Sequence, residues 1–156
     1  MATGTVKWFA QALADLMNKQ HDLDSDDLRI AIVTAATVPA VATAAPHFGG
    51  TGTTNFATTQ VATAGTSYTG PVALANKSIS LGATGPTFRA DVVSLAQDAA
   101  GFANGAWGII YNNTDASKRA LAFVELSAAG AASLVSGPVS VDWFGGTNDV
   151  LDILAA

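Results

Sequence analysis

Apolar residues recur at helical spacing near the start of the chain. Between Val6 and Leu16 they lie three or four positions apart, with polar residues on the other side. This spacing is typical of an amphipathic helix whose apolar stripe faces a core. We therefore predict one helix over about residues 5–18, with Thr3 or Thr5 available as its N-cap.

The pattern then changes from helical to extended. Leu28–Val33, "LRIAIV", is apolar except at Arg29 and is rich in β-branched residues, which predicts a strand. From residue 71 to 156, short apolar or alternating runs are separated by turn residues; these runs are "PVALA", "SISL", "TFRADVVSLA", "AWGIIYN", "ALAFVEL", "GPVSVDWF" and "DVLDILA". Such a rhythm predicts a mainly β fold, a β-sandwich or jelly-roll-like barrel with one N-terminal helix packed on it.

A polar stretch separates two of these apolar runs. In Trp107–Arg119, "WGIIYNNTDASKR", an apolar segment enters a group of Asn, Asp, Ser, Lys and Arg, and a second apolar segment follows. Asn and Asp favour tight connections, and the charged residues keep them solvated. We predict a hairpin loop here.

A long segment of the chain carries no acidic or basic residue. Between Arg29 and Lys77 there is no Asp, Glu, Lys or Arg. Within it, residues 34–70 show no sustained period, and a compact domain rarely contains so long a loop without structure. We predict a mixture of short strands and an extended loop or arm.

The absence of charge in this segment has two interpretations. It is either covered by a partner or left as a neutral loop rich in Thr and Gly. We favour the first, in which Ile30–Asn76 supplies much of a subunit contact, because interface centres are depleted in charge and enriched in aromatic residues. Its expected anchors are Phe48, Phe56 and Tyr68.

Composition limits the class of protein. The 156 residues are 49% hydrophobic and only 12% charged, with no cysteine and a formal net charge of −5. We predict a single domain over residues 1–156. The chain has no basic stripe for nucleic acid and no apolar run long enough to span a membrane, so we expect neither nucleic acid nor a membrane as a partner. It has no signal-peptide core at its start, so we expect no secretion.

One acidic cluster resembles part of a calcium loop. Asp22, Asp24 and Asp26 occupy positions 1, 3 and 5 of such a loop, but Asp27 stands at position 6 and Val33 at position 12. A calcium loop needs Gly and a bidentate Glu at those two positions. We therefore predict a solvated connection and no metal, with weak calcium binding as the alternative.

The remaining candidate chemistry is sparse. His21 and His47 are the two histidines, and no nucleophile motif accompanies them. We expect His21 to lie at the helix end, where a cation is favoured. The "FGGTGTT" cluster lacks the lysine of a P-loop. We therefore expect no catalytic residue and no cofactor.

Several phrases of the chain resemble a group of small virion proteins of tailed bacteriophages, described as head-decoration or capsid-cement proteins. They are the stretch from His21 to Ala31, "YTGPVALANKSIS", the hairpin "WGIIYNNTDASKRALAF", and "VSVDWFGGTNDVLDILA" as a last pair of strands. The resemblance implies a β-rich subunit that binds an assembled shell and stabilises it.

The expected function follows from this resemblance. The chain would be a structural virion protein, assembled in the host cytoplasm, whose partners are the major capsid protein or other virion subunits and itself as a homo-oligomer. Two alternatives stay open: a tail, connector or fibre component, and a carbohydrate-binding β-sandwich module. We do not expect an enzyme.

Overall fold

The computed structural model describes residues 5–82, 85–127, 131–141, 143 and 149–152. Its centre is a five-stranded antiparallel sheet of order β1-β10-β9-β2-β5. The strands of this sheet, in that order, are Lys7–Trp8, Ala120–Glu125, Trp107–Asn112, Leu28–Val33 and Val72–Ala73. The mainly β fold with one helix near the N-terminus is confirmed.

The three central strands are buried on both faces. In β2, β9 and β10, nearly every residue is buried, although successive side chains point to opposite sides of the sheet. Both sides of the sheet must therefore be covered. This agrees with the unbroken apolar runs of these strands in the sequence, and the predicted hairpin connects β9 to β10.

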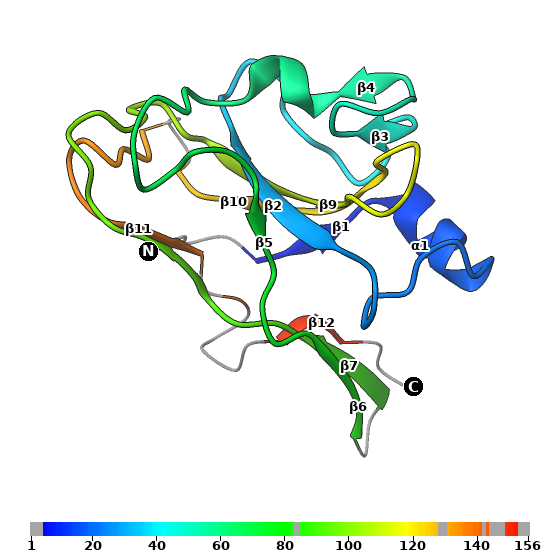
Figure 1. Ribbon diagram of the computed structural model, residues 1–156. Helices are drawn as coiled ribbons and strands as arrows, with labels where there is room; N and C mark the ends of the chain where they lie inside the picture. The colour runs from blue at the N-terminus through cyan, green and yellow to red at the C-terminus, as the bar shows by residue number, and fades with distance from the viewer. Residues whose placement is uncertain (1–4, 83–84, 128–130, 142, 144–148, 153–156) are drawn as a thin grey trace.

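The segment predicted as short strands and loop lies over one side of this sheet (Figure 1). It contains the parallel pair β3 (Pro46–His47) and β4 (Thr54–Asn55), followed by the 3₁₀ helix η1 (Phe56–Thr59). The Phe48 N–H donates to the Lys118 carbonyl at 3.0 Å, so this segment docks against the tip of the β9–β10 hairpin.

Two smaller sheets complete the described fold. β8 (Val93–Leu95) pairs with β11 (Val139–Val141), while β7 (Gly85–Arg89) lies between β6 (Ser78–Gly82) and β12 (Asp149–Asp152). The two last strands expected in "VSVDWFGGTNDVLDILA", β11 and β12, are present, but they pair with β8 and β7 and not with each other. The β6–β7 hairpin projects away from the central sheet (Figure 1).

The helix is shorter than predicted. α1 spans Ala10–Met17, and Lys7–Trp8 instead forms β1, which pairs with β10. Pairing at the sheet edge satisfies the backbone of these residues and buries Trp8, so the helix begins only after Phe9. The predicted cap threonines are not used: Thr5 precedes β1, and Thr3 lies outside the described residues.

The predicted apolar stripe is buried only in part: Phe9 is buried, and Val6 and Leu16 pack against the core. Met17 is 86% exposed and Leu13 is 38% exposed, whereas Ala12 and Asp15 are buried. The inward-facing Asp15 lies 3.3 Å from Arg119 of the β9–β10 hairpin. No apolar period in the sequence reveals this ion pair.

Candidate protein interface

The three expected contact anchors lie inside the fold of their own chain. Phe48 stacks on Tyr111 with ring centroids 4.7 Å apart, and Phe56 packs 5.9 Å from Phe9. Phe56 and Tyr68 are fully buried. These side chains hold the uncharged segment to the central sheet and are not available to a partner, so the expectation that they anchor an interface has to be corrected.

Tyr68 shows how this internal anchoring works. Its hydroxyl oxygen accepts hydrogen bonds from the Ile32 N–H at 2.9 Å and from Gln60 Nε2 at 3.2 Å. Burial raises the pKa of the phenol. An aromatic residue in a neutral segment gives the same local sequence signal whether it packs on its own sheet or on a partner, so sequence reasoning could not separate the two.

The polar residues of the interior gather between α1 and the β9–β10 hairpin. The Asp15 carboxylate lies 3.3 Å from Arg119 Nε and 3.7 Å from His21 Nε2, and it also accepts a hydrogen bond from Gln11 at 2.7 Å. We expected His21 to lie at the helix end, but it is buried in this cluster instead. The cluster ties the helix to the hairpin.

The second histidine lies beside the same arginine. His47 is buried in β3, and it forms a β-bridge with Arg119. Burial and the nearby guanidinium charge both lower the pKa of the His47 ring. The structure thus brings together two histidines that are far apart in the sequence, but it encloses them in the fold.

Asn112 connects this cluster to the acidic loop. Its Nδ2 donates to Asp26 at 2.6 Å and lies 3.1 Å from His21 Nδ1. An amide nitrogen can only donate, so Nδ1 of this ring is the acceptor and the proton sits on Nε2, toward Asp15. No sequence motif marks this contact, because its members come from three separate segments.

The acidic loop satisfies its own backbone. Asp22 Oδ1 accepts hydrogen bonds from the N–H groups of Asp24 and Ser25 at 3.1 and 3.2 Å, and the Asp22 N–H donates to Asp26 at 2.9 Å. The bonds from Ser25 hold the pKa of Asp22 below its usual range. In the part of the chain that the structure describes, no three His, Cys, Asp or Glu side chains are arranged to hold a metal ion.

The β6–β7 hairpin is an open surface. We call its strands, Ser78–Gly82 and Gly85–Arg89, the arm, which is distinct from the loop or arm predicted over residues 34–70. All five residues of β6 are exposed, with Leu81 at 84% and Ile79 at 53%. Single exposed apolar residues are common, but neighbouring ones that form a contiguous patch often mark a contact surface. The arm is therefore the described element best suited to contact another molecule.

The arm has one apolar face and one polar face. Ile79 lies opposite Phe88, and Leu81 lies opposite Pro86, so these four side chains share a face. Phe88 at the base is buried, but the face continues outward uncovered. The opposite face carries the serines of β6.

The base of the arm is firmly attached to the body. The Asp91 N–H donates to the Ala75 carbonyl at 3.0 Å, and Asn76 Nδ2 donates to the Asp91 carboxylate at 2.6 Å. The indole of the buried Trp143 donates to the Asp91 carbonyl at 2.9 Å. These contacts join the two strand-bearing segments of the arm where they leave the body.

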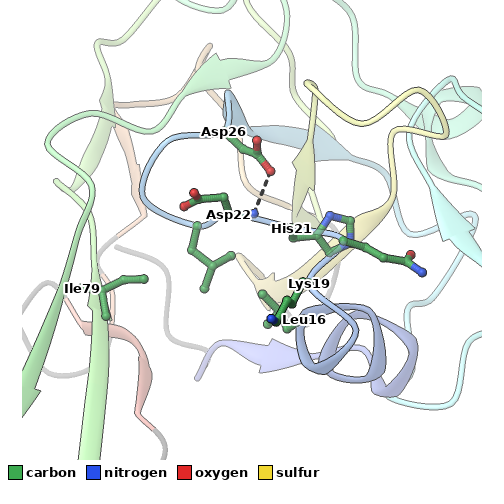
Figure 2. A pocket seen from close by; sticks show the side chains of 8 residues that line it. Leu16, Lys19, His21, Asp22, Asp26 and Ile79 are labelled. Atoms are coloured by element: carbon green, nitrogen blue, oxygen red, sulfur yellow. Dashed lines mark hydrogen bonds between the residues drawn. The ribbon is translucent and has the colours of Figure 1, made fainter.

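A hollow of about 480 Å³ lies between the arm and the body (Figure 2). Ile79 lines it from the arm, and Leu16 and Leu23 line it from the body. Lys19, Asp22 and other polar residues form the rest of its lining. The apolar face of the arm thus continues into a depression whose lining is partly apolar and partly polar.

One edge of the arm is open as well. In the three-stranded sheet β12-β7-β6, β6 is hydrogen-bonded on one side, and no strand within the described ranges pairs with its other side. An exposed, uncharged edge strand readily accepts another strand. The alternation of Ser, Ile, Ser and Leu predicted a strand, but it also implied that the apolar face would be covered.

The structure contains no helix, among the residues it describes, that is long and apolar enough to cross a membrane. No protein-family model matches the chain, and no curated protein or solved structure was found to be similar to it.

Proposed function

We propose that this chain is a structural protein of a tailed-phage virion, which binds the assembled capsid and stabilises or decorates it. The observation that supports the proposal best is the arm, a neutral hairpin whose apolar face and one strand edge are both open. Its partners in this function are the major capsid protein or other virion subunits. Its role is to hold subunits together and not to catalyse a reaction.

The physical properties of the arm support such a role. Strand addition at an open edge gives main-chain hydrogen bonds, and neighbouring side chains then make the contact specific. A single contact of this size is weak by itself. Repeated over a shell, many weak contacts act together because each bound subunit raises the effective concentration of the next.

The low charge of the chain fits the same role. Only 12% of its residues are charged, about half of the usual share of roughly 25%. A protein whose surface is covered on assembly needs fewer charges to stay dispersed than one that remains free. A tail, connector or fibre position uses the same surface, so the place of binding on the virion has to be determined directly.

Immunogold labelling of virions tests the proposal. An antibody raised against the purified chain would be applied to particles made by the bacterium that carries the gene. The proposal expects gold over the heads, in many copies per particle. Gold confined to tails would replace the capsid role with the tail alternative. Virions that carry no gold, and in which mass spectrometry does not detect the chain, would contradict the proposal.

A further inference from the structure

We infer that the arm pairs with the arm of a second copy of this chain, β6 against β6, around a two-fold axis that passes near Ser80. This inference deepens the proposed function by naming the partner of the arm, and it rests on that function only in treating the arm as an assembly surface.

The sequence of β6 is self-complementary. When two copies of Ser78–Gly82 run antiparallel with Ser80 facing Ser80, Ile79 of each copy lies opposite Leu81 of the other. Directly opposed side chains have Cβ atoms about 4.5–5.5 Å apart, so the two apolar residues contact each other across the axis. A shift of one residue would place apolar residues opposite serines and lose this match.

The hollow beside the arm provides room for the same contact. Leu81 is the most exposed residue of the apolar face, and in the paired arrangement it lies next to Ile79 of the second copy. Ile79 lines the hollow together with Leu16 and Leu23. Each copy therefore presents an exposed leucine and, beside its own Ile79, a depression in which Leu16 and Leu23 offer apolar contacts to the leucine of the other.

Charge does not oppose this pairing at the contact itself. The chain has a formal net charge of −5, which disfavours association in general, but residues 78–82 contain no charged side chain. Hydrogen bonds from Ser25 and from Arg29 do most to lower the pKa of Asp22 and of Asp27, and the charge of Lys77, next to β6, adds a smaller part. Lys77 therefore lies near acidic residues of its own chain.

A two-fold pairing also explains why an open apolar edge need not cause fibres. The same strand edge is used by both copies, so the contact is closed after two chains. The product is one six-stranded sheet of order β12-β7-β6-β6-β7-β12, built from the two three-stranded sheets. The open edge of β6 is then covered in both copies, which removes the hazard that such an edge presents.

Sedimentation velocity of the purified chain over a concentration series tests the association. We expect a monomer–dimer equilibrium, and we expect Leu81→Lys to raise its dissociation constant by about tenfold or more while the circular dichroism spectrum stays unchanged. Val38→Lys is the matched control, because Val38 is an apolar residue 66% exposed that lies outside the arm. A wild-type chain that stays monomeric, or a dimer that Leu81→Lys leaves intact, would overturn the inference.

A disulfide trap tests the register, since the chain has no cysteine of its own. Ser80→Cys places two thiols opposite each other, near the Cβ separation of about 3.5–4.5 Å that a disulfide needs. We expect it to form a covalent dimer on mild oxidation. Ser78→Cys should stay monomeric, because four residues of offset separate its two copies by about 13 Å along the strand.

The two proposals fail in distinguishable ways. An isolated chain that is monomeric and not trapped by Ser80→Cys, but still labels virion heads, would remove the self-pairing and leave the capsid role standing. A trapped dimer that is absent from virions would leave the pairing and remove the role. Equal trapping of Ser78→Cys and Ser80→Cys would overturn the proposed register.

Discussion

Asp98 joins two loops that are far apart in the sequence. Its Oδ2 accepts hydrogen bonds from the N–H groups of Thr66 and Ser67 at 2.5 and 2.9 Å, and its Oδ1 accepts one from the Ala100 N–H at 3.0 Å. Such bonds favour the ionised carboxylate, and they hold the pKa of Asp98 at about 2. The end of the uncharged segment thus depends on one charged residue outside it.

This environment predicts a pH dependence. The pKa of Asp98 is lower in the folded chain than in the unfolded one, so its contribution to stability is present above about pH 4 and lost as the pH falls toward 2. We expect Asp98→Asn to lower the melting temperature at pH 7, with a difference from the wild type that shrinks toward pH 2. Asp24→Asn, at an exposed acid, is the control. An equal loss at every pH would contradict this assignment.

Gly50 is needed where two backbones approach. A Cβ placed on Gly50 would lie 2.0 Å from the carbonyl oxygen of Ser117, at the tip of the β9–β10 hairpin. A backbone atom cannot move aside as the end of a side chain can. The glycine cluster "FGGTGTT" therefore includes a position where the chain has to pass close to the hairpin.

We expect Gly50→Ala to reduce the free energy of unfolding by about 1–3 kcal/mol, the usual cost of forcing an extra methyl group into a packed site. The matched control is Gly137→Ala, since a Cβ at Gly137 meets no atom within 4 Å. Urea denaturation of the two variants measures the difference. Equal stability of the two variants would show that the 48–52 segment does not dock as described.

At the scale of elements, the hairpin is held in place from beneath its turn. Asn112, the last residue of β9, is almost fully buried and donates to Asp26, while its Oδ1 accepts from the Thr114 and Asp115 N–H groups at 2.9 and 3.2 Å. One side chain thus closes the turn and fastens it to the acidic loop. Local turn propensity predicts the hairpin, but it does not predict this attachment.

We expect Asn112→Ala to lower the free energy of unfolding by about 1–3 kcal/mol, because it takes a hydrogen-bond partner from the buried His21 and removes the bonds that close the turn. Asn113→Ala is the neighbouring control. Asn113 is only partly buried and donates to Asp27 at 2.8 Å, so its loss should cost about 0.5 kcal/mol. Chemical denaturation compares the pair, and a reversed order would contradict the role given to Asn112.

The elements differ in how well the sequence predicts them. The strands Leu28–Val33, Trp107–Asn112 and Ala120–Glu125 were predictable because each is a continuous apolar run, as expected when both sides of a sheet are covered. The start of α1 was not, because Val6 and Phe9 continue the helical period while the backbone of Lys7–Trp8 pairs with β10. Long-range pairing overrides local spacing there.

At the scale of the whole molecule, the uncharged segment is covered within its own fold, whereas the arm is exposed. The long neutral segment buries its aromatic residues in its own chain, while the short strand "SISL" leaves two large apolar side chains in the open. The low charge of the chain predicts that part of its surface is neutral and suited to a partner. The position of that surface depends on which elements pack on the central sheet, and no local sequence pattern predicts this packing.

The central claim is that the chain binds the virion as a structural subunit, and that the arm is needed for this binding because it pairs two copies of the chain. The most direct test is to add the purified chain to virions from a phage whose copy of the gene is deleted, and to sediment the particles. We predict that the wild-type chain and Val38→Lys sediment with the heads to saturation, and that Leu81→Lys stays largely in the supernatant. A wild-type chain that stays in the supernatant, or a Leu81→Lys chain that binds as well as the wild type, would contradict the claim.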